Sequence, residues 1–115
     1  MSKVTRQDIA DTLSTVPGLR GLAIPPNTYS PGDAWPVWAS TTFLTFTDFE
    51  VGFDVYVVLP NADLDATLAE ADPWVEAVAF ALASIAVVTT VDPARIMVER
   101  NGNPVPALHF AITTV

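Results

Sequence analysis

Residues 48–60 alternate between apolar and other side chains with a period of two. The apolar positions are every second residue: Phe49, Val51, Phe53, Val55, Val57 and Leu59. Such alternation in β-branched and aromatic residues is typical of a strand with one face against a core. Pro60 cannot donate a hydrogen bond to a neighbouring strand, so it ends the pattern. We therefore expect residues 48–60 to form the central strand of a small sheet.

A helix is predicted before this strand, over residues 5–16. Thr5 is a suitable N-cap, and Asp8 completes a pattern that resembles a capping box. Ile9 and Leu13 begin an apolar stripe four residues apart, which continues at Val16. The dipeptide Pro17-Gly18 follows, and glycine at this position can take the positive φ that ends many helices.

A second main helix is predicted to begin at Asp72-Pro73. Aspartate is favoured at the N-cap and proline at the first helical position. A separate short helix is expected just before it, over residues 63–70. The inward stripe of the main helix comprises Trp74, Val78, Ala81, Leu82 and Ile85.

Four further strands complete the predicted sheet. We expect them at residues 19–24, 37–47, 87–91 with a continuation at 95–100, and 104–115. Asp92-Pro93 is expected to interrupt the third of these, and Asn101-Gly102 is a hairpin signal. The resulting order predicts an α+β fold in a single domain, 1–115. Its antiparallel or mixed sheet has four to five strands, with two main helices packed on one face.

The composition excludes several classes of function. The net charge is −8, and the five basic residues are scattered along the chain rather than clustered, which argues against nucleic-acid binding through phosphates. No apolar run reaches the roughly 18 residues of a membrane helix, and the first residues lack the apolar core of a signal peptide. The absence of cysteine fits a protein that folds in a reducing cytoplasm.

No constellation of reactive side chains stands out, so we expect no catalytic residues, cofactor or metal. His109 is the single histidine and is expected at a surface or an interface. Asp54 is expected on the outer face of the central strand, facing an arginine. The acidic residues of segment 63–72 lack the glycine and the spacing of a calcium loop, and no glycine-rich phosphate loop is present.

Tryptophans in a proline-rich loop are the conspicuous candidates for binding. Trp35 and Trp38 lie beside prolines, which stiffen a loop by fixing φ. Their side chains either fold back on the core or form an exposed anchor at a subunit interface, where tryptophan is favoured. Strand 37–47 carries apolar groups on both faces, which also favours a subunit contact. The interface candidates are Trp35, Trp38, Tyr29, Phe43 and Phe46.

The most distinctive run of the chain is Pro31-Gly32-Asp33-Ala34-Trp35-Pro36, which Val37-Trp38 follows. Together with strand 55–60 and the helix that carries Trp74, this run resembles the small tail terminator proteins of long-tailed, siphovirus-type phages of actinobacteria. The order of elements is similar as well, over almost the whole chain. The final hairpin departs from the family, because many terminators carry more charge there.

The resemblance implies a structural protein of the virion rather than an enzyme. Such a protein would form a ring, usually of six copies, that caps the tail tube, ends its polymerisation and offers a joining surface to head-completion proteins. Its partners would be further copies of itself, the tail tube protein and a head-completion or stopper protein. It would assemble in the host cytoplasm and lie at the head-proximal end of the tail, and DNA would pass through without specific binding.

Two alternatives remain open. One is another head–tail connector, head-closure or minor tail component of a phage. The other, more remote, is a small enzyme or ligand-binding domain with a similar α+β shape. Ring formation separates both phage functions from the enzyme, and binding to tube ends rather than to portal rings separates the two phage functions.

Overall fold

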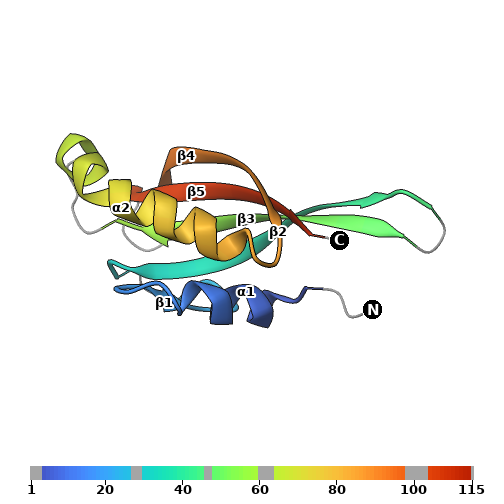
Figure 1. The fold of residues 1–115 in the computed structure, drawn as a ribbon. Helices are drawn as coiled ribbons and strands as arrows, with labels where there is room; N and C mark the ends of the chain where they lie inside the picture. Colours follow the sequence, from blue (N-terminus) through green and yellow to red (C-terminus); the bar gives the residue numbers. More distant parts are fainter. Residues whose placement is uncertain (1–3, 27–29, 46–47, 60–63, 98–103, 115) are drawn as a thin grey trace.

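The computed structural model describes residues 4–26, 30–45, 48–59, 64–97 and 104–114, and their side chains except at 64–72, 93–97 and 104–105. The elements of this part of the chain are α1 (Arg6–Leu13), β1 (Arg20–Gly21), β2 (Asp33–Phe43), β3 (Phe49–Val58), α2 (Leu64–Leu82), β4 (Val87–Met97) and β5 (Pro104–Thr114). Their order is the predicted one except that no separate short helix precedes the second main helix, because α2 already begins at Leu64. The α+β fold class is confirmed (Figure 1).

The described residues form a five-stranded sheet in the order β1-β2-β3-β5-β4. β1 runs parallel to β2, and the remaining neighbours are antiparallel, so the sheet is mixed. β3 lies in the middle, as its alternation predicted. Val55 illustrates its position, since it pairs with Pro36 of β2 on one side and with Phe110 of β5 on the other.

The core lies between the sheet and the two helices, which pack on the same face. The face of β3 that carries Phe53, Val55 and Val57 is buried, and so is the matching face of β5. The helix side chains that cover these strands are spaced three or four residues apart, as an amphipathic stripe requires. They are Ile9, Leu13, Val78 and Leu82. No helix in the described ranges is both long and apolar enough to cross a membrane.

The start of α1 is the predicted capping box. The Thr5 hydroxyl accepts a hydrogen bond from the backbone N–H of Asp8 at 3.1 Å, and the Asp8 carboxylate accepts one from the N–H of Thr5 at 2.8 Å. These two bonds satisfy donors that have no partner within the helix. After the helix, Gly18 takes a φ of 85°, which confirms its predicted positive value.

Three predictions about prolines were wrong. α2 runs through Pro73 instead of starting there, β4 runs through Pro93, and β2 already contains Pro36. β4 is the last strand of the sheet, and β1 pairs with only two residues of β2, so Pro93 and Pro36 lie in edge positions where a missing N–H is tolerated. In α2 the apolar stripe after Pro73 packs against the sheet, and tertiary packing overrides the local cost of proline.

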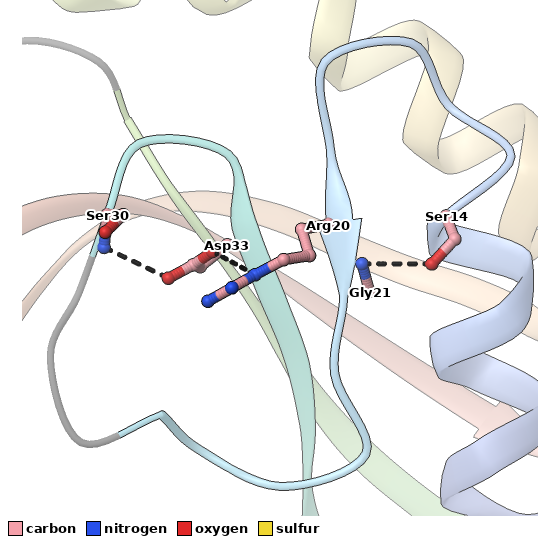
Figure 2. Close-up of polar contacts among 5 residues, drawn as sticks. All are labelled: Ser14, Arg20, Gly21, Ser30 and Asp33. Atoms are coloured by element: carbon pink, nitrogen blue, oxygen red, sulfur yellow. Dashed lines mark hydrogen bonds and ion pairs between the residues drawn. The ribbon is translucent and has the colours of Figure 1, made fainter.

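A buried carboxylate fixes the beginning of β2. Asp33 accepts hydrogen bonds from Nε of Arg20 at 3.0 Å and from the backbone N–H of Ser30 at 3.1 Å, while its side chain is almost fully buried. Next to it, the hydroxyl of Ser14, the C-cap residue of α1, accepts a bond from the N–H of Gly21 at 3.1 Å. Figure 2 shows these contacts joining α1, β1 and β2. Because Asp33 has a partner on each side, the strand starts at one defined place.

From this fixed start, β2 and β3 form a hairpin that extends far beyond α1 and α2 (Figure 1). The molecule is therefore elongated, with principal extents of 46 × 29 × 20 Å and a radius of gyration of 14.2 Å. A compact domain of this length would have a radius of gyration of about 13 Å. We call the projecting part, residues 38–45 and 48–51, the arm.

Gly32 provides a test of the fixed start, because its φ is 89° and an added Cβ would collide with the carbonyl oxygen of Gly18. We expect Gly32→Ala to lower the free energy of unfolding by more than about 2 kcal/mol, from strain and collision together. Gly18→Ala is the matched control, since its φ is similar but its Cβ would meet Trp74 at an ordinary 3.6 Å. Gly18→Ala should lower the free energy of unfolding by only about 1 kcal/mol. Urea unfolding measures the free energy of unfolding of both variants. Equal decreases would contradict a collision between the added Cβ at position 32 and the carbonyl oxygen of Gly18.

Candidate interaction surface

One face of the arm carries its aromatic side chains. The register pairs Trp38 with Phe53, Thr41 with Val51, and Phe43 with Phe49. Residues that are directly opposite in an antiparallel pair point to the same side of the sheet, and Phe49, Val51 and Phe53 alternate along β3. All six therefore lie on the face that α1 and α2 cover in the body of the molecule. The arm continues that face beyond the helices.

A β-bulge makes this arrangement possible. The register shifts between Trp38 and Ser40, so Ala39 is an extra residue without a direct partner. Trp38 and Thr41 are three positions apart, which would place them on opposite faces of a regular strand. The bulge brings them to the same face, where Nε1 of Trp38 donates a hydrogen bond to Oγ1 of Thr41 at 3.0 Å.

The aromatic face of the arm is exposed in the single chain. The exposed fraction is 56% for Trp38, 74% for Phe43 and 56% for Leu44 at the end of β2. The rings of Phe43 and Phe49 lie 5.9 Å apart, so the side chains are ordered against one another. Large apolar groups that are grouped and exposed mark an interaction site more often than scattered ones do.

The arm also lacks charge over most of its length. Residues 34–47 contain no acidic, basic or histidine side chain. The residue before this segment, Asp33, is paired with Arg20. In a chain of net charge −8, an uncharged surface is where a second acidic molecule can approach with the least repulsion.

The predicted interface residues do not lie together. Trp38 and Phe43 share the exposed face of the arm, but Trp35 belongs to β2 rather than to a loop and is only 2% exposed. It packs on the opposite side of the sheet, 6.2 Å from the ring of Tyr56, so it is not an exposed anchor in the single chain. Tyr29 and Phe46 lie outside the described residues.

The opposite face of the sheet holds a polar cluster that the sequence did not reveal. Nε2 of His109 lies 2.7 Å from the Asp54 carboxylate, and Nδ1 lies 3.6 Å from that of Asp92. The three residues come from β5, β3 and β4. Asp54 is on the outer face, as predicted, but it faces His109 and not an arginine. The available signal was that Asp54 and His109 both occupy non-core positions of alternating strands.

This cluster links three neighbouring strands on the outer face of the sheet. Nε2 of His109 is at hydrogen-bond distance from Asp54, whereas Nδ1 is at ion-pair distance from Asp92. The two carboxylates lie on different sides of the imidazole, so they do not converge on one point. Among the described residues, no group of three or more histidine, cysteine or acidic side chains could hold a metal ion.

Tyr56 lies beside this cluster, with its ring 5.3 Å from that of His109. Burial raises the pKa of Tyr56 above its ordinary value of 10.0, and the negative charge of Asp54 raises the pKa further. Both causes act against the phenolate. The contribution of Tyr56 to stability is therefore full below pH 10 and is lost as the pH rises through the raised pKa.

A tyrosinate titration tests both causes. In a Tyr29→Phe background Tyr56 is the one remaining tyrosine, and we expect its absorbance transition above pH 10. Adding Asp54→Asn should lower the pKa of Tyr56 only part of the way back, since burial is the larger cause. A full return to the ordinary value would show that Asp54, and not burial, dominates. An unchanged pKa of Tyr56 would show that the charge of Asp54 has no effect on the ionisation of the phenol.

No family model matches the chain, and no curated protein matches it either. The function has to be inferred from the residues themselves and from the surfaces they form.

Proposed function

We propose that the protein is a structural subunit that self-associates into a ring, caps a phage tail tube, ends its polymerisation and presents a joining surface to head-completion proteins. The observation that carries this proposal is the arm, whose exposed aromatic face has no covering layer among the described residues. A sheet face of this kind is stable when another element covers it. A neighbouring copy is available to every subunit of a homo-oligomer.

The distinctive run at residues 31–36 supports the proposal through what it does in the fold. Gly32 adopts a positive φ, Asp33 pairs with Arg20, and Trp35 is buried. Each of these residues helps to fix the start of β2, and β2 continues into the arm. The run that resembles tail terminators is thus the part of the chain that orients the arm.

The chemistry of the described residues also favours a structural role. The polar cluster around His109 joins side chains of three neighbouring strands, with Asp54 at 2.7 Å and Asp92 at 3.6 Å from the ring nitrogens, which suits a role in holding the sheet together. The acidic character of the chain suits a ring through which DNA passes, because like charge discourages binding. Another head–tail connector would share these properties, so the partner of the ring distinguishes the two phage functions.

Native mass measurement and a polymerisation assay test the proposal together. We expect the purified chain to form a ring, and the ring to stop the growth of tubes of tail tube protein by binding their ends. Trp38→Ala with Phe43→Ala should remain folded, because both side chains are exposed, and should run as a monomer that no longer caps tubes. Each truncation removes an interface anchor that contributes about 2 kcal/mol.

Ile24→Ala is the matched control, since Ile24 is 66% exposed and lies in the segment between β1 and β2, outside the arm. It should form the same ring as the unmodified chain. Binding to portal rings instead of tube ends would favour the connector function. A chain that stays monomeric at every concentration would contradict both phage functions.

A further inference from the structure

The outer part of the arm is a ribbon of two strands. The pairing of β3 with β5 ends where Val51 lies opposite Thr114, and β1 pairs only with the beginning of β2. Beyond this point, the sheet formed by the described residues consists of β2 and β3 alone (Figure 1). We call residues 42–45 and 48–50 the arm tip.

None of the described side chains of the arm tip is buried. Burial along β2 is confined to its first four residues, and the first buried residue of β3 is Phe53. The closed tip is held by contacts within itself. The ring of Phe43 lies 5.9 Å from that of Phe49, and the N–H of Leu44 donates to the carbonyl oxygen of Asp48 at 2.9 Å.

The arm tip therefore depends on the core less than the rest of the sheet does. Val55 and Phe110 are fully buried and lie in strands that have a neighbour on each side. A two-stranded ribbon is only marginally stable in water. Segments with few buried apolar contacts and exposed backbone hydrogen bonds open at a smaller free energy than the whole molecule unfolds.

We propose that the arm tip opens as a separate unit in a substantial fraction of single chains, and that packing against a second copy closes it. The closing step rests on the proposed function, because self-association supplies the covering layer. While the tip is open, Phe43 and Leu44 are not held in one geometry, so that chain cannot form the contact. The apparent affinity of self-association is reduced by the fraction of chains whose tip is closed, which limits association of free chains.

Hydrogen exchange of the single chain tests the opening. NMR follows the amides of Leu44 in the tip and Val55 in the body at a concentration where light scattering shows a monomer. We expect Leu44 to exchange within about tenfold of the rate of an unstructured peptide, and Val55 far more slowly. Low concentrations of urea should change the Leu44 rate little, because local opening exposes little surface. Equal protection of the two amides would overturn the proposal.

Thr42→Lys tests the coupling by stabilising the tip. The register places Thr42 opposite Glu50, on the face that lacks the aromatic side chains, so lysine adds a cross-strand ion pair. We expect exchange of Leu44 to slow by about threefold and exchange of Val55 to stay the same. Self-association should tighten by up to the same factor relative to Thr15→Lys, which adds the same charge outside the arm. Slower exchange without tighter association would overturn the coupling.

Exchange in the assembled protein separates this inference from the proposed function. Association should slow exchange in peptides that contain Leu44 by about tenfold or more, as mass spectrometry measures, because the tip is then covered. Rings that cap tubes while Leu44 exchanges as in the single chain would overturn the closing step and leave the function standing. Rings that protect Leu44 but do not stop tube growth would support the closing step and overturn the function.

Discussion

The apolar face of the sheet is longer than the helical layer that covers it, and the other features of this protein follow from that mismatch. α1 and α2 bury the face of β3 and β5 over the body of the molecule, where Val55 and Phe110 pair at the centre. Past the helices the same face continues through Phe49 and Phe43 with nothing above it in the described chain. Burial of apolar area is the main favourable term in folding and in association, so the uncovered part remains available for an intermolecular contact.

The fixed start of β2 makes this uncovered face a defined surface. Asp33 is held by Arg20 and by the backbone of Ser30, and Ser14 ties Gly21 to α1. A one-residue slip of a strand turns all of its side chains to the other face. The pairing of β2 is set at its first residue and shifts once at the bulge, so Trp38 and Phe43 both reach the apolar side of the arm. Buried Asp33 and the exposed aromatic groups thus belong to one strand, β2, and Asp33 fixes the register that orients them.

Much of the fold could be predicted from local patterns, and the errors have a common cause. The alternation around Val55 identified the central strand, and Thr5 with Asp8 identified the start of α1. Prolines were misjudged, because whether Pro36 or Pro93 can lie within a strand depends on an edge position that the sequence does not display. Of the interface candidates, the structure brings Trp38 and Phe43 to one exposed face but buries Trp35. Trp35 and Trp38 are three residues apart, so on a strand they lie on opposite faces; assigning them to a loop concealed this.

The bulge at Ala39 has a geometric consequence of its own. An unpaired residue in one strand bends the hairpin and increases its twist, so the direction in which the arm leaves the body depends on backbone length at one position. The side chains that make the contact are separate from that residue. If the arm joins neighbouring copies, the angle from each copy to the next depends on this bend, and that angle determines how many copies complete a circle. The number of subunits could then change through a single insertion or deletion at the bulge, while the side chains that make the contact stay the same.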